Sequence, residues 1–189
     1  MNRIGIIGDI GSGKSFVAKN FGYPVFNADL EVSKLYKKDK RIFFKLRKIL
    51  PNHIRSFPIN KIEITNAILD RDKNLTKIVN IVHKEIRKKM NSFLKKNKNK
   101  KFVILDIPLL LENKINSKKD ILVFVESKKN DIQKRLRKRK GFNIKLFNKF
   151  KKIQFKLEFK KRKSHHIIKN SFKVKPVKKE IKKILSKII

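Results

Sequence analysis

The residues with the clearest chemistry lie near the start of the chain. They are Gly8-Asp9-Ile10-Gly11-Ser12-Gly13-Lys14-Ser15, which fit the pattern G-x-x-x-x-G-K-[ST]. In this pattern the glycines let successive backbone N–H groups turn inward towards phosphate oxygens. The lysine, Lys14, reaches the β- and γ-phosphates, and the hydroxyl of Ser15 ligates Mg²⁺. The motif predicts a bound nucleoside triphosphate, but ATPases, GTPases and small-molecule kinases all use it.

The flanking residues supply the structural context that the motif requires. The apolar run Ile4–Ile7 precedes the loop and predicts a buried strand, while Val17, Ala18 and Phe21 follow it on one face of a helix. The start of that helix adds the positive end of its dipole to the phosphate site. Strand, loop and helix therefore follow one another in the expected order.

Two carboxylates are candidates for the rest of a phosphoryl-transfer site. We predict a strand over residues 23–30 that ends at Asn27 and Asp29, and another over 102–106 that ends at Asp106. Ligands of open α/β sheets bind at the carboxyl ends of the strands. Asp106 would order the Mg²⁺ shell through water, and Asp29 would orient an acceptor hydroxyl or accept its proton. The alternative for both is that they only cap the following helix.

Further apolar runs predict the remaining strands. Residues 121–125 and, more weakly, 167–168 form short runs of the kind found in strands buried on both faces. Together these signals predict an α/β fold with three layers, in which helices flank a parallel sheet of about five strands. The core would comprise residues 1–30 and 101–189.

Residues from about 31 to 100 change character and predict a helical insertion. The segment is rich in lysine, has few strand signals, and is broken by Pro51 and Pro58. One predicted helical face carries Ile78, Val82, Ile86, Met90 and Phe93. A second, very basic helical stretch covers about 130–163, and the chain ends in an amphipathic helix.

The net charge of +38 favours a nucleic-acid partner at first sight. However, the lysines are spread over nearly every segment after Ser33, and Ile, Asn and Phe are also abundant, as an AT-rich genome would impose. We therefore expect no specific nucleic-acid function. The chain has no cysteine and no run long enough for a signal peptide or a membrane span, so we expect a cytoplasmic protein that does not bind membranes.

Four blocks of the sequence resemble the dephospho-coenzyme A kinases, a family of P-loop kinases. They are Ile10–Ser15, Val25–Asp29, Asp106-Ile-Pro-Leu-Leu-Leu-Glu112, and the spaced set Arg135, Arg139, Gln154 and Asn170. The third block discriminates most, because general nucleoside-monophosphate kinases lack it. The blocks are in the right order and cover nearly the whole chain.

The resemblance implies an activity, in which ATP phosphorylates the ribose 3′-hydroxyl of dephospho-coenzyme A with Mg²⁺, and it implies roles for residues. Asp29 would be the base or orienting group, and the insertion would bind the acceptor. Arg135 and Arg139 would belong to a basic lid over about 134–163. The residues implied to bind ATP are Gly11, Ser12, Gly13, Lys14, Ser15, Phe16 and Asn170. Those implied to shape the acceptor pocket are Asp29, His83, Pro108, Leu109 and Leu110.

The sequence also departs from the family pattern. Asp9 stands where the family has Gly, Asn27 replaces an Asp, and Phe16 replaces a Thr. A carboxylate at position 9 should weaken nucleotide binding unless it points to solvent. The alternatives are a nucleoside or nucleoside-monophosphate kinase and a P-loop protein that binds nucleic acid.

Overall fold

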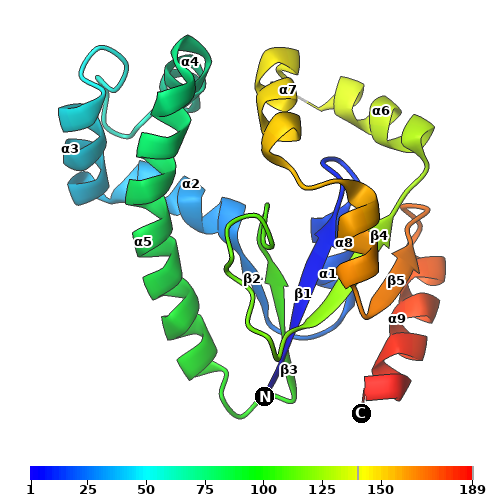
Figure 1. Cartoon of the computed structure of the whole chain (residues 1–189). Helices are drawn as coiled ribbons and strands as arrows, with labels where there is room; N and C mark the ends of the chain where they lie inside the picture. Colours follow the sequence, from blue (N-terminus) through cyan, green and yellow to red (C-terminus); the bar gives the residue numbers. More distant parts are fainter. Residues whose placement is uncertain (140, 189) are drawn as a thin grey trace. The chain divides into compact units, whose positions relative to one another are not determined.

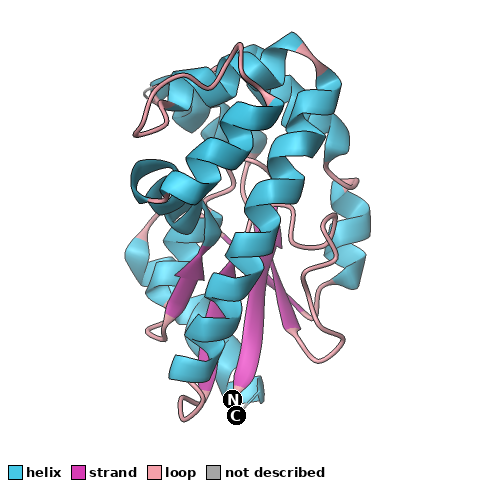
Figure 2. Ribbon diagram, turned by 90° about the vertical axis from the view of Figure 1, so that its left-hand side faces the viewer, coloured by secondary structure: helices cyan, strands magenta, loops and turns pink. Residues whose placement is uncertain are grey.

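The short apolar runs form a parallel sheet in the computed structural model, which describes residues 1–139 and 141–188. Within these residues the sheet has five strands in the order β2-β3-β1-β4-β5, all parallel (Figures 1 and 2). The strands are β1 (Asn2–Gly8), β2 (Val25–Asn27), β3 (Phe102–Asp106), β4 (Ile121–Glu126) and β5 (His166–Lys169). The predicted fold class is confirmed. Lys140, in the predicted lid, and Ile189, at the end of the predicted core, lie outside the described residues.

The chain divides into two compact units. The core unit comprises Met1–Asn27, Asn97–Asn143 and Lys149–Ile189, and the helical unit comprises Ala28–Lys96 and Ile144–Asn148.

In the core unit, helices cover the sheet. Helices α1 (Lys14–Asn20) and α9 (Val174–Ile188) pack on one face, and α8 (Leu157–Lys163) contacts β1 and β4 (Figure 1). Alternate strand residues such as Ile4 and Ile104 form a buried cluster with Val17 of α1 and Ile181 of α9. Helix α6 (Lys129–Lys138) follows β4, and α7 (Ile144–Ile153) has its first half, Ile144–Asn148, in the helical unit and its second half in the core unit. The inner strand β3 is buried along its whole length, as expected where helices cover a parallel sheet, whereas the edge strand β5 is partly exposed.

The helical unit contains α2 (Ala28–Lys38), α3 (Lys40–Ile49), α4 (Lys61–Asp70) and α5 (Asp72–Lys96). The long α5 contacts the other three. Its predicted apolar face is confirmed, with Phe93 half-buried and four residues buried: Ile78, Val82, Ile86 and Met90. The two prolines lie between helices, and the bond Phe57–Pro58 is cis.

The predicted strand over residues 23–30 is too long. The strand β2 ends at Asn27, and Asp29 lies in the first turn of α2. Ala28 and Leu35 are buried at helical spacing, so packing selects the helix. The carboxylates of Asp29 and Glu31 are also favourable near the positive end of the helix dipole.

None of the helices in the described part of the chain is long and apolar enough to cross a membrane.

Candidate active site

The glycine-rich loop runs from the end of β1 into α1, as its motif requires. Gly13 precedes α1 with a φ of 85°, a left-handed conformation that glycine adopts without strain. A Cβ at Gly13 would also collide with the amide of Asn170 and the ring of Phe172. Gly11 has the same φ and lies close to Ile132 and Leu136 of α6. Glycine is therefore required at both positions for conformation and for close packing.

The two polar residues that end the motif, Lys14 and Ser15, are the first two residues of α1. The Nζ of Lys14 donates a hydrogen bond of 2.7 Å to the carbonyl of Asp9, across the loop. Ser15 is exposed in the first turn of α1. Phe16, predicted from the resemblance to bind ATP, is half-buried and packs against the apolar cluster of the core unit.

Asn170 stabilises the backbone of the glycine-rich loop through a hydrogen bond. Its side chain is buried, its Nδ2 donates to the carbonyl of Ser12 at 2.8 Å, and its Oδ1 accepts from the N–H of Phe172 at 2.9 Å. The hydroxyl of Ser127 donates to the same Ser12 carbonyl at 2.9 Å. The ends of β4 and β5 thus support the loop backbone through these two side chains.

Arg135 of α6 stacks on an aromatic ring beside the loop. Its guanidinium lies 4.2 Å from the centroid of the Phe172 ring, which in turn faces Gly13. Such a planar cation on an aromatic ring can stabilise α6 and can present a flat surface to a purine base. Sequence reasoning missed Phe172, because nothing in its neighbourhood marks a lone Phe among the 15 of the chain. Arg139 is exposed and follows the end of α6.

Asp106 ends β3, as predicted, and its carboxylate is buried. Asn27 of the neighbouring β2 is its partner in the sheet register, and the Nδ2 of Asn27 donates to Asp106 Oδ2. If the Asp usual in the family stood at position 27, two carboxylates would face each other. Among the described residues no group of three or more His, Asp or Glu suits a metal ion.

The helical unit carries two of the predicted acceptor residues. Asp29 is exposed in α2, and only Ala28 separates it from Asn27 along the chain. His83 is half-buried on α5, and burial, with the nearby Arg87 guanidinium, lowers the pKa of its imidazole. We therefore expect His83 to be neutral at pH 7.

In the turn after β3, Leu110 is buried, whereas the two residues before it are partly exposed. Leu110 is 1% exposed and packs next to Gly5 of β1. Pro108 and Leu109 are half-buried, and Leu109 adopts a left-handed φ of 53°. A Leu in this conformation costs about 1 kcal/mol, so the surrounding structure must enforce the turn.

Glu112, the last residue of the most discriminating block, ties the turn to α8. Its Oε1 lies 2.7 Å from Nζ of Lys160 and accepts the N–H of Phe155 at 3.0 Å. The two side chains are only 7% and 4% exposed. Through these two contacts, Glu112 of the third sequence block stabilises the connection between α7 and α8.

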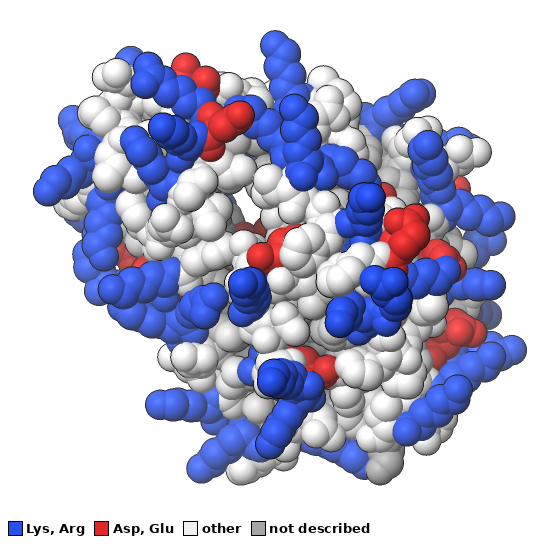
Figure 3. Space-filling view, viewed as in Figure 1, with Lys and Arg blue, Asp and Glu red and all other residues white. Residues whose placement is uncertain are grey.

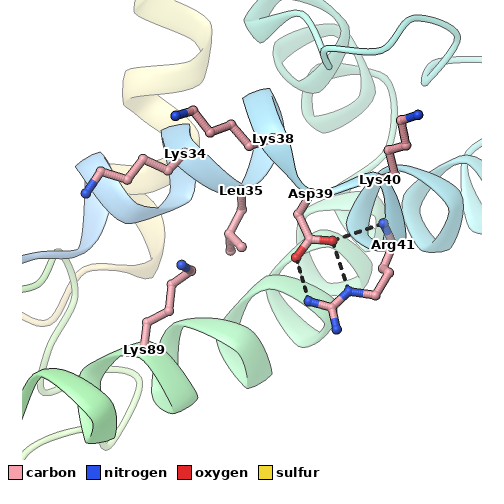
Figure 4. A pocket seen from close by; sticks show the side chains of 7 residues that line it. All are labelled: Lys34, Leu35, Lys38, Asp39, Lys40, Arg41 and Lys89. Carbon is pink, nitrogen blue, oxygen red and sulfur yellow. Dashed lines mark hydrogen bonds and ion pairs between the residues drawn. The ribbon is translucent and has the colours of Figure 1, made fainter.

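The helical unit also has a basic pocket of about 550 Å³ between α2, α3 and α5 (Figure 4). Glu31 pairs with Lys34 at 2.6 Å and with Lys89 at 3.5 Å, and Asp39 pairs with Arg41 at 3.1 Å. Burial would raise the pKa of Glu31, but the two ammonium groups outweigh it and keep the pKa low. Three of the five basic side chains that line the pocket are thus paired with an acid. The lining residues are Lys34, Leu35, Lys38, Asp39, Lys40, Arg41 and Lys89.

Known proteins are similar to this chain in both sequence and fold. The family model for dephospho-CoA kinase matches residues 2–175. A dephospho-CoA kinase of Wolbachia pipientis wMel is 33% identical, over 98% of this chain and 97% of the relative. One from the Wolbachia of Brugia malayi is 37% identical over 127 residues, which are 65% of each chain.

Two solved structures support the same fold. The protein TT1252 of Thermus thermophilus matches with a TM-score of 0.80 at 22% identity, over 100% of this chain and 98% of that one. Dephospho-CoA kinase from Campylobacter jejuni matches with a TM-score of 0.63 at 20% identity, over 99% and 97% of the two chains. At these identities the two structures support the fold alone, whereas the family model and the sequence relatives establish the family. The chain belongs to the dephospho-CoA kinase family.

Proposed function

We propose that this chain transfers the γ-phosphoryl group of ATP to the ribose 3′-hydroxyl of dephospho-coenzyme A, giving coenzyme A and ADP. The observation that carries the proposal is the loop Gly8–Ser15, built at the carboxyl edge of a parallel sheet in a member of this family. Backbone N–H groups, the Lys14 ammonium and the start of α1 supply the positive potential that a triphosphate needs.

On the donor side, the chain's own residues orient ATP and stabilise the moving charge. Lys14 would leave the Asp9 carbonyl for the β- and γ-phosphates, since a charge-assisted bond to phosphate is stronger than one to a neutral carbonyl. The stacked pair Arg135 and Phe172 lies beside Gly13 and offers a flat surface for the adenine. Arg139 would bring a further cation as the lid closes and excludes water.

On the acceptor side, Asp29 would orient the 3′-hydroxyl or accept its proton. Its place one residue beyond Asn27–Ala28 links it along the chain to the strand end that holds Asp106. His83, Pro108 and Leu109 would shape the rest of the acceptor site.

The oxygen donors present also fit Mg²⁺. The Ser15 hydroxyl would ligate Mg²⁺ and the Asp106 carboxylate would order its shell through water, since Mg²⁺ in such sites typically takes one or two protein ligands together with phosphates and water. When bound, the ion would neutralise charge that develops between the phosphates.

The first prediction concerns Asp29. We expect Asp29→Asn to lower kcat with dephospho-coenzyme A by about 10²- to 10⁴-fold and to leave the Kd for ATP within about twofold. Steady-state kinetics and ATP titration measure the two quantities. Asp72→Asn is the matched control, since Asp72 is also exposed in the first turn of a helix of the same unit. A parallel loss of kcat and ATP affinity would remove Asp29 from the acceptor side.

The rival is a kinase for nucleosides or nucleoside monophosphates. A panel of these acceptors, run beside dephospho-coenzyme A, separates the two. Robust turnover of a nucleotide with none of dephospho-coenzyme A would overturn the proposal.

A further inference from the structure

Asp9 is the acid of the glycine-rich loop, and it follows directly on β1. Its backbone carbonyl accepts hydrogen bonds from Lys14 Nζ at 2.7 Å and from the Ser12 N–H at 3.2 Å. The residue is thus part of the loop framework that surrounds the phosphate site. A carboxylate there repels a triphosphate over a short distance unless another charge cancels it.

Lys151, in the last turn of α7, supplies that charge. Its Nζ lies 2.6 Å from Asp9 Oδ1, with 42% of the Lys151 side chain and 19% of the Asp9 side chain exposed. The same oxygen accepts the N–H of Ile10 at 2.7 Å. The carboxylate is therefore fixed by two donors and does not swing freely into the loop.

A second side chain shows that the segment 151–154 of the core unit contacts the loop at more than one point. Gln154, three residues after Lys151, donates from Nε2 to the carbonyl of Gly8 at 3.1 Å. Side chains three residues apart share a face at a helix end. Consecutive loop residues, Gly8 and Asp9, are thus held by neighbouring side chains of one segment.

We infer that Lys151 is a positioning residue for ATP, which acts through Asp9 by neutralising its carboxylate and holding it away from the phosphates. The inference rests on the proposed binding of ATP at the loop, and not on the identity of the acceptor. It accounts for an acid at a position where the resembling family has Gly. It also gives one particular lysine, among 53 basic residues, a defined task.

A double-mutant cycle tests this inference. Four forms are compared by calorimetric titration with ATP: the wild type, Lys151→Met, Asp9→Asn and the double variant. Asn at position 9 keeps an oxygen for the Ile10 N–H but carries no charge. We expect Lys151→Met to weaken ATP binding about fivefold, as for the loss of a partly exposed ion pair.

The double variant gives the decisive reading. If Lys151 acts through Asp9, removing the acid restores ATP affinity to within about twofold of the wild type. Lys151→Arg, which keeps the charge, should also retain affinity. Lys152→Met removes an exposed lysine one residue further along α7 and serves as the control, with an expected change within about twofold.

Two results would overturn the inference. If the double variant binds ATP as weakly as Lys151→Met, Lys151 acts on the nucleotide directly and not through Asp9. If Lys151→Met binds ATP like the wild type, the ion pair has no part in binding. Because ATP titration needs no acceptor, a protein that failed to phosphorylate dephospho-coenzyme A would still give a clear answer on Lys151.

Discussion

At the residue scale, positions that depart from the family pattern have found specific partners. Asn27 donates to the buried Asp106, where a second carboxylate would have been repelled, and Asp9 pairs with Lys151. Asn170, which the resemblance assigned to ATP, is bound to the Ser12 carbonyl and the Phe172 N–H. Its direct contact with ATP stays a prediction, while its support of the loop follows from these bonds.

A prediction at this scale concerns Asn170. Aspartate at this position has no donor for the Ser12 carbonyl and would place its charge against that oxygen. We expect Asn170→Ala to lower the free energy of unfolding by about 1–3 kcal/mol and Asn170→Asp to lower it further at pH 7. Urea denaturation measures both. The exposed Asn130→Asp is the control, with an expected change within about 0.5 kcal/mol. An Asp variant as stable as the wild type would contradict the bracing role.

At the element scale, the connection between α7 and α8 is fixed from two sides. Gln154 binds the carbonyl of Gly8, and the next residue, Phe155, binds Glu112 through its N–H. The buried ion pair of Glu112 with Lys160 then fixes α8. The basic stretch predicted as a lid thus comprises several helices. Of these, α8 is held within the core unit by the ion pair of Lys160 with Glu112.

The prediction at this scale compares adjacent lysines of α8. Lys160→Met leaves the Glu112 carboxylate buried without its cation and should lower the free energy of unfolding by about 3–5 kcal/mol. Lys161→Met is the matched control, because its partner Glu126 is 37% exposed and such pairs contribute less than about 1 kcal/mol.

A second variant keeps the test sharp if Lys160→Met does not fold. Glu112→Gln combined with Lys160→Met removes both charges and should recover most of the loss. Thermal unfolding followed by circular dichroism compares the three proteins. Equal effects of Lys160→Met and Lys161→Met would show that burial of the pair does not matter.

At the scale of the whole molecule, charge is the conspicuous property. Basic side chains are spread over the face shown in Figure 3, with acids scattered among them. Several lysines have local partners, such as Lys34 with Glu31 and Lys88 with Glu85. A surface of this kind attracts polyanions without selecting a sequence.

We therefore expect binding to double-stranded DNA that falls steeply as salt rises and that ATP changes by less than about twofold. Fluorescence anisotropy with a labelled duplex of arbitrary sequence, at several NaCl concentrations with and without ATP, measures this. Binding that tightens or weakens strongly with ATP would favour the P-loop protein that acts on nucleic acid.

The sequence by itself determined the features that depend on local order along the chain. The loop Gly8–Ser15, the buried strands and the apolar face of α5 follow from spacing and periodicity, because these are properties of neighbouring residues. The sequence also indicated the family, since the block that ends at Asp29 and the block that begins at Asp106 are each a run of consecutive residues. The end of β2 was misplaced, because packing of Ala28 and Leu35, and not local propensity, selects the helix there.

Only the tertiary structure decided which distant side chains meet. Lys151 is 142 residues from Asp9, Asn170 is 158 from Ser12, and Lys160 is one lysine in a run of basic residues. No pattern in the sequence separates Lys151 and Lys160 from the neighbouring lysines. The resemblance to the family did single out Asn170, but not its bond to the Ser12 carbonyl, because the parallel sheet and the helices on it bring these partners together. The phosphate loop consists of eight consecutive residues and can be recognised from the sequence. The side chains that stabilise its conformation come from distant parts of the chain and can be identified only in the tertiary structure.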